Sequence, residues 1–344
     1  MEEALAELLA KAPWIILAGV IVVCLFLLAE GAEWLVREAV TLSSRSGIPK
    51  VVVGATIISI GTTTPEAVVS VLAAITGRPG LALGNAVGSI IADTGLILGL
   101  ACLIAPLPLQ RRIVNRQGWL QFACGVALVL SCLPFGNLGQ VFTEGGRLPR
   151  VMGLVFLLGL AAYLVVSVRW ARQGNLASDD VVEEASHKEE RSSITAVALK
   201  LIAAIVVVVA SSWVLIPAVS EAAMRLQVPE SIIAATMVAF GTSLPELVTA
   251  VTAARHGHGE LAVGNIVGAD ILNVLFVAGA SAAVTRGGLQ CPPHFFTLYF
   301  PSMLLVLIVF RVGIFTSGSH LRRPFGFALL GTYIAVTILS YVVT

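Results

Sequence analysis

Two glutamates stand inside apolar segments of this chain, each at the end of the same short run of residues. The first run is Gly-Thr-Thr-Thr-Pro-Glu over 61–66 and the second is Gly-Thr-Ser-Leu-Pro-Glu over 241–246. They belong to a longer duplication, because residues 55–99 and 235–279 align without a gap at an offset of 180 and match at 19 of 45 positions. Ionisable side chains in such segments are costly and indicate function. The duplication, broken by Gly and Pro in both copies, predicts a site with two-fold pseudo-symmetry.

A polar stripe follows each glutamate. In the first copy Asn85, Ser89 and Asp93 are spaced four residues apart and share one helical face, on a segment otherwise rich in apolar residues. The corresponding positions of the second copy are Asn265, Ala269 and Asn273. We therefore expect Glu66, Glu246 and Asp93 to converge with hydroxyl and amide groups in a site that is not fully symmetric.

The chemistry of this site follows from its oxygen atoms. Pro65 and Pro245 each remove a backbone donor, which predicts free carbonyls near residues 59–62 and 239–242. Thr62 and Glu66 share a helical face, as do Thr242 and Glu246. Three unpaired carboxylates cannot all stay charged in a medium of low dielectric constant, so bound cations or protons must balance them. Carboxylate, hydroxyl and carbonyl ligands favour calcium, magnesium or sodium over softer metals. The alternative, that these residues only hold helices together, suits single Thr, Ser and Asn side chains better than the glutamates.

The composition places these segments in a membrane. The chain is 57% hydrophobic and 12% charged, with a mean hydropathy of +0.95. We predict an all-α polytopic membrane protein without a large domain outside the bilayer. The expected ten transmembrane helices are near 14–38, 50–76, 80–105, 117–135, 150–170, 194–222, 229–254, 259–285, 294–311 and 325–343.

Charge in the connections predicts the topology. With the N-terminus outside, the inner connections hold fifteen Lys and Arg residues and the outer ones six. This bias favours ten spans with both termini outside the cytoplasm. The polar segment 172–193 reads as a cytoplasmic linker between a first five-helix repeat, 1–171, and a second, 194–344. Because five is odd, the two repeats are expected to be inverted relative to each other.

Several function classes are excluded or disfavoured. The net charge of +1 gives no sign of a nucleic-acid partner, the five cysteines are scattered, and the histidines show no zinc-site spacing. No catalytic Ser/His or Asp/Asp pairing appears, so an enzyme such as an intramembrane hydrolase is disfavoured. Three further acids, Asp270, Glu30 and Glu33, have no acidic counterparts in the other copy. Asp270 is a weaker candidate for the site, and Glu30 and Glu33 are expected near an interface.

The paired motifs, Gly-Thr-Thr-Thr-Pro-Glu with GNAVGSIIAD and Gly-Thr-Ser-Leu-Pro-Glu with GNIVGADILN, resemble the alpha repeats of the cation/calcium exchanger superfamily. The nearest likeness is to prokaryotic sodium/calcium exchangers, and it runs through essentially the whole chain. The resemblance implies an antiporter of the cell (inner) membrane that exchanges calcium for sodium by alternating access, works as a monomer in the lipid bilayer, and has no permanent cofactor.

The resemblance also implies individual roles. Glu66 and Glu246 would be the principal calcium ligands, assisted by Thr62 and Thr242. The sodium sites and remaining motif positions would fall to Thr63, Ser243, Ser59, Ala239, Asp93, Ser89, Asn85, Asn265 and Asn273. The Asp is in the first repeat here, whereas well-studied prokaryotic members have it in the second, and Ala269 replaces a serine. These departures bear on the number of sodium ions.

Two alternatives stay open. A proton/calcium antiporter would use Glu66 and Glu246 to exchange protons, although the hydroxyls of Thr63 and Ser243 favour sodium. A passive cation channel would show flux without countertransport.

Overall fold

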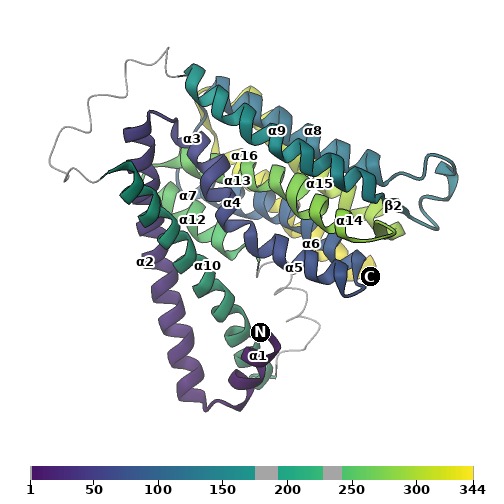
Figure 1. Cartoon of the computed structure of the whole chain (residues 1–344), viewed down its shortest axis with the longest axis horizontal. Helices are drawn as coiled ribbons and strands as arrows, with labels where there is room; N and C mark the ends of the chain where they lie inside the picture. The colour runs from purple at the N-terminus through teal and green to yellow at the C-terminus, as the bar shows by residue number, and fades with distance from the viewer. Residues whose placement is uncertain (1, 175–192, 228–241, 344) are drawn as a thin grey trace.

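The computed structural model describes residues 2–174, 193–227 and 242–343, and this part of the chain is almost entirely helical (Figure 1). Within this described part, seven helices are long and apolar enough to cross a membrane, or eight if the bent pair Lys50–Thr62 and Thr64–Ile75 is one span. Apart from 229–254, of which residues 229–241 lie outside the described residues, every expected span coincides with helix. The chain is therefore a helical, multi-pass membrane protein, and the count of ten spans stays a prediction. The expected span near 117–135 is helix α8, whose first turns carry three arginines.

The first half of the chain forms helices and two short strands. In chain order these are α1 (Glu2–Lys11), α2 (Trp14–Ser46), α3 (Lys50–Val53), η1 (Gly54–Ile58), α4 (Ser59–Thr62), α5 (Thr64–Ile75), α6 (Pro79–Ile91), η2 (Ala92–Ile97), α7 (Leu98–Ile104), β1 (Leu107–Pro108), α8 (Arg111–Cys132), η3 (Leu138–Gln140), β2 (Gly146–Leu148) and α9 (Arg150–Gly174). Elements η1 and η2 are π-helical segments that continue the neighbouring α-helices, whereas η3 is a single 3-10 turn.

The second half repeats much of this order. It comprises α10 (Ile194–Arg225), α12 (Leu244–Arg255), α13 (Gly259–Leu272), the π-helical η5 (Asn273–Ala278), α14 (Gly279–Val284), β3 (Leu289–Cys291), the π-helical η6 (Phe295–Tyr299), α15 (Phe300–Thr316), β4 (His320–Leu321) and α16 (Arg323–Val343). At the 180-residue offset, η5 falls within one residue of η2. The two copies therefore carry π-helical segments at equivalent positions. Short π-helical segments inside α-helices often mark functional sites.

Contacts between the halves also recur in equivalent pairs. Strand β1 pairs antiparallel with β4, and β2 pairs antiparallel with β3, so each small sheet joins one half to the other. In the same way α7 packs against α16, and α14 packs against α9. The two halves are thus interlocked rather than placed side by side as independent domains.

Helices α2 and α10 pack together along much of their length and project from the remaining bundle (Figure 1). The approach is close at Gly31, where an added Cβ would lie 2.9 Å from a methyl carbon of Val207. Much of the outward surface of α2 is apolar and exposed, including Ile15 at 83% and Phe26 at 63%. Such a surface requires lipid rather than water around it.

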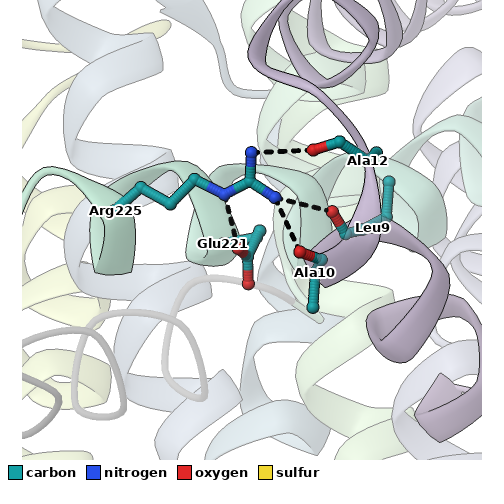
Figure 2. Close-up of polar contacts among 5 residues, drawn as sticks. All are labelled: Leu9, Ala10, Ala12, Glu221 and Arg225. Atoms are coloured by element: carbon teal, nitrogen blue, oxygen red, sulfur yellow. Dashed lines mark hydrogen bonds and ion pairs between the residues drawn. The ribbon is translucent and has the colours of Figure 1, made fainter.

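A short helix that sequence patterning did not predict, α1, is held to the end of α10 by Arg225 (Figure 2). The guanidinium lies over the ring of Trp14 and bonds Glu221 at 2.6 Å. It also donates to three backbone carbonyls at the end of α1, those of Leu9 (3.0 Å), Ala10 (2.9 Å) and Ala12 (2.8 Å). Carbonyls in the last turn of a helix have no partner within it, so an arginine there supplies both hydrogen bonds and a favourable charge.

Candidate ion-binding site between the two halves

Each motif glutamate lies in the first turn of a helix. Glu66 is at the start of α5 and Glu246 at the start of α12, and each side chain is 1% exposed. A proline among the first residues of each helix suits this position, because the missing N–H has no intrahelical acceptor there. The axis bends by 43° between α4 and α5. The glutamates are thereby held at helix N-termini, where the helix dipole favours negative charge.

Hydroxyl and amide groups cross from one half to the other at equivalent positions. The Thr62 hydroxyl donates to Oδ1 of Asn265 at 3.5 Å, and the Thr242 hydroxyl donates to Oδ1 of Asn85 at 3.3 Å. These two contacts are the same contact at an offset of 180 residues. The Thr63 hydroxyl adds a bond to Oε1 of Glu246 at 3.2 Å. The predicted motif residues of the two copies are therefore in direct contact.

Asp93 and Asn273, which occupy equivalent positions in η2 and η5, meet each other. The Asn273 amide donates to Oδ2 of Asp93 at 3.5 Å. Equivalent residues can touch only where they lie next to the axis that relates the two copies, so this pair marks the centre of the site. The charge of Asp93 acts on Glu66, and the charge of Glu246 acts on both Asp93 and Glu66. The three acids that the sequence predicts to converge share one electrostatic environment.

Several buried atoms of the site have no hydrogen-bond partner within the described part of the chain. They are Oε2 of Glu66, Oε2 of Glu246, Oδ1 of Asp93, Oγ of Ser243, Nδ2 of Asn265 and Oδ1 of Asn273. No lysine or arginine forms an ion pair with these carboxylates among the described residues. Buried oxygens without partners are costly, and a cation bound between them would satisfy them.

The arrangement suits mixed oxygen ligands rather than a cluster of acids alone. Among the described residues, no three carboxylate, imidazole or thiol side chains come together as a metal site would require. A cation here would instead draw on carboxylates, hydroxyls, amide oxygens and backbone carbonyls, which is the ligand set of sodium and calcium.

The remaining predicted residues lie in the site or around it. The Ser59 carbonyl accepts from the Thr63 N–H at 2.8 Å, so at least one of its lone pairs is occupied, and its side chain is fully buried. Ser89 is buried on α6, and the Asn85 amide donates to Ser70 at 2.9 Å. Ala239 lies outside the described residues. The site is therefore described fully on the side of the first copy and in part on the side of the second.

Glu30 and Glu33 lie on the exposed surface of α2, whereas the acids of the site are buried. Glu33 is 3.8 Å from Nε2 of His256, with both side chains more than half exposed. An exposed pair of this kind contributes little to stability.

Asp270, a weaker candidate from the sequence, contacts two residues that the sequence motifs do not mark, Thr94 and Gln121. Asp270 is 2% exposed on α13 and accepts hydrogen bonds from both. The available signal was a pair of glutamines four residues apart, Gln117 and Gln121, in an apolar segment.

Comparison with known proteins identifies the family of the chain. The family model "Sodium/calcium exchanger protein" matches residues 16–169 and 196–342. The inner membrane protein YrbG of Escherichia coli is 31% identical over 325 residues, covering 94% of this chain and 96% of that protein. The sodium/calcium exchanger MaX1 of Methanosarcina acetivorans is 27% identical over 343 residues, covering 92% and 96%.

A solved structure of the sodium-calcium exchanger NCX_Mj has the same fold, with a TM-score of 0.74 at 23% identity, covering 94% of this chain and 98% of that one. The resemblance read from the motifs is thereby confirmed at the level of the family. The chain belongs to the sodium/calcium exchanger protein family, whose members are ion transporters and not enzymes.

Proposed function

We propose that this chain is a secondary active antiporter that exchanges calcium for sodium across the membrane by alternating access. The observation that carries the proposal is that Glu66, Glu246 and Asp93 interact electrostatically where the two copies join, with unpartnered oxygens and no basic partner among the described residues. Family membership and the printed function of MaX1 support calcium and sodium as the ions.

Within this proposal the chain has ten spans as two inverted five-helix repeats, with both termini outside the cytoplasm in a cell (inner) membrane. The repeat boundaries are 1–171 and 194–344, joined by the cytoplasmic linker 172–193. The contacts that recur at the 180-residue offset support a two-fold relation between the repeats. The excess of Lys and Arg in alternate connections supports the inversion.

Glu66 and Glu246 are proposed to bind calcium between them, with Thr62 and Thr242 contributing backbone oxygens. The hydroxyl of each threonine donates a hydrogen bond to the asparagine of the other copy. These bonds fix the two threonines just before α5 and α12 begin. Sodium is proposed to bind at sites that overlap the calcium site. The residues proposed to contribute to them are Thr63, Ser243, Ser59, Ala239, Ser89 and Asp93. Asn85, Asn265 and Asn273 complete the lining of the site.

Overlap makes the ions compete, and competition couples their fluxes. A carrier with uncompensated carboxylates at bilayer depth is costly to rearrange, since the charge must cross a medium of low dielectric constant. Filling by calcium or by several sodium ions lowers this cost, so only adequately neutralised forms interconvert. No permanent cofactor enters the cycle, and one chain contains both copies of the motif, so a monomer is sufficient.

Uptake of radioactive calcium into vesicles containing the purified protein tests the proposal. Uptake should require sodium inside the vesicles, and it should fall when sodium is replaced by N-methyl-D-glucamine. Glu33→Gln, a charge removal on the exposed face of α2, provides a control and should leave uptake unchanged. Uptake driven by a pH gradient without sodium would instead establish a proton/calcium antiporter, and flux without any counter-ion would indicate a channel.

A further inference from the structure

Two buried cysteines, one from each half of the chain, interact with each other. Cys132 is the last residue of α8 and Cys291 is the last residue of β3, and they are 0% and 1% exposed. Both are free thiols in the structure. A hydrogen bond with the Cys132 thiol, followed by burial, raises the pKa of the Cys291 thiol, which lies in the connection between α14 and η6. The two sulfur atoms are thus neighbours, although no sequence spacing links them.

The backbone around this pair holds the end of α8 against β3. Gly146 of β2 pairs with Cys291 in the antiparallel ladder, and a Cβ added at Gly146 would overlap the carbonyl oxygen of Cys132. A Cβ added at Gly145 would overlap the carbonyl oxygen of Cys291. Two successive glycines therefore let the backbones of both cysteines approach the same short segment. The contact between the thiols follows from this packing and not from one side-chain rotamer alone.

No other pair of cysteines interacts in this way among the described residues. The Cys102 thiol donates to the carbonyls of Leu321 and Arg322 at 3.5 Å each, beside the sheet of β1 and β4, which contains no cysteine. Cys24 and Cys124 lie within α2 and α8, and neither interacts with another cysteine. The cysteine pair therefore belongs to only one of the two small sheets that join the halves.

The topology proposed above puts this pair at the outer end of the bundle. Cys132 lies near the end of the fourth expected span, and Cys291 directly precedes the ninth, so both adjoin connections assigned to the outer side of the membrane. Disulfides form and persist in oxidising compartments, which lie outside the cytoplasm. Two neighbouring thiols on that side have the location that a lasting disulfide requires.

We propose that Cys132 and Cys291 are a modification site, joined by a disulfide that links the two halves covalently outside the cytoplasm. The oxidant is a protein of the outer compartment that carries an active-site disulfide. The thiolate of one cysteine attacks that disulfide, which gives a mixed disulfide and releases one thiol of the oxidant. The second cysteine then attacks the sulfur of the first, and the oxidant leaves as a dithiol. The chain loses two protons and two electrons, and the oxidant gains both.

Burial determines when this reaction occurs. Neither thiol is accessible once α8, β2 and β3 have packed, so the exchange takes place during insertion and folding, and the same packing then protects the bond from reductants. The raised pKa of Cys291 keeps its thiol protonated at neutral pH, and the thiolate is the reactive form. Oxidised glutathione should therefore oxidise the reduced, folded protein slowly, and faster as the pH rises.

Thiol counting on the wild-type protein tests the proposal directly. Bacterial cells that express the full chain are quenched in acid, denatured and treated with N-ethylmaleimide, which blocks free thiols. A reductant then opens any disulfide, and a polyethylene-glycol maleimide labels the thiols that it releases. The wild type should acquire two such labels, and mass spectrometry without reductant should find the peptides of Cys132 and Cys291 linked. Blocking of all five cysteines before reduction would overturn the proposal.

Single substitutions identify the bonded pair. Cys132→Ala and Cys291→Ala should each abolish both labels, because neither cysteine can form the bond alone. Cys102→Ala is the matched control, since it makes the same change at a buried cysteine beside the other sheet, and it should keep both labels. Two labels that persist in Cys132→Ala would overturn the assignment. The wild-type count and the linked peptides decide the question even if a variant fails to fold.

The orientation on which the proposal rests is measured separately. Glu144 is exposed in the connection between η3 and β2. Glu144→Cys, in a chain that lacks Cys132 and Cys291, should react with a membrane-impermeant maleimide added outside the cells. Labelling of this variant together with five free thiols in the wild type would overturn the disulfide alone, whereas no labelling would overturn the orientation and the disulfide with it. Absence of calcium exchange would overturn the proposed function and would leave both thiol measurements unchanged.

Discussion

The contact between Thr94 and Asp270 has an apolar counterpart at the equivalent positions of the other copy. At the 180-residue offset these positions hold Val274 and Ile90, each 1% exposed. One pair of equivalent positions thus carries a hydroxyl and a carboxylate, whereas the other pair carries two aliphatic side chains. The helices that bear them keep the same order, so the difference is one of chemistry and not of architecture.

This comparison separates two kinds of site residue. Glu66 with Glu246, and Thr62 with Thr242, are present in both copies, whereas Asp270 and Asp93 each have a counterpart without charge. In a carrier built from inverted repeats, alternating access exchanges the roles of the two halves, so groups present twice serve the step that both sides of the membrane require. Groups present once can set the number and kind of ions without altering that step.

The duplicated glutamates should give the largest effect. Glu66→Gln and Glu246→Gln should each reduce calcium exchange at least 100-fold, because loss of one charge from a buried ion site costs about 3 kcal/mol or more. The measurement is the uptake of radioactive calcium into sodium-loaded vesicles that contain each variant. Similar losses from the two variants would support equal roles, whereas wild-type exchange in either would remove that glutamate from the site.

Asp93 tests the asymmetric part of the comparison. Asp93→Asn makes both central residues asparagine and should raise the sodium concentration for half-maximal uptake about tenfold, with a smaller change in calcium affinity, since one charge near 4 Å is worth about 1 to 4 kcal/mol in surroundings of high to intermediate dielectric constant. The double variant Asp93→Asn/Asn273→Asp moves the charge to its equivalent position and should recover part of the sodium dependence. Unaltered sodium dependence in the single variant would exclude Asp93 from the sodium sites.

The features that could be read from the sequence are those that duplication or hydropathy marks. The exact register of the two copies predicted that Glu66 and Glu246 share a site, and apolar segments of sufficient length predicted the helices. The direct contacts of Thr62 with Asn265 and of Thr242 with Asn85 follow from the same register, because a two-fold relation that brings one pair together must bring the other.

The features that the sequence could not predict depend on packing between segments that are not equivalent in the two copies. Gln121 lies outside the duplicated blocks and meets Asp270 across 149 positions of sequence, so no spacing rule links them. Arg225 reads as one more charge in an outer connection, yet it caps α1, a helix that precedes the first span. Both contacts depend on how whole helices approach one another.

The smallest effects on transport should come from the hydroxyls of Thr63 and Ser243, the residues directly before α5 and α12. The two residues are equivalent in sequence but differ in their contacts. Thr63 donates to Glu246 at 3.2 Å, whereas the Ser243 hydroxyl meets no hydrogen-bond partner among the described residues. If both hydroxyls bind sodium, Thr63→Val and Ser243→Ala should each raise the sodium concentration for half-maximal uptake about fivefold, since one hydrogen bond contributes about 1 kcal/mol.

Thermal stability distinguishes this role from packing alone. A buried hydroxyl without a partner is unfavourable in the ion-free protein, so Ser243→Ala should raise the melting temperature measured without sodium and reduce the further rise that sodium produces. Thr63→Val removes an existing bond to Glu246 and should lower the melting temperature under the same conditions. A Ser243→Ala variant that gains thermal stability but keeps the full stabilisation by sodium would show that this hydroxyl is not a sodium ligand. Ser243 would then differ in function from Thr63, its equivalent in the first copy.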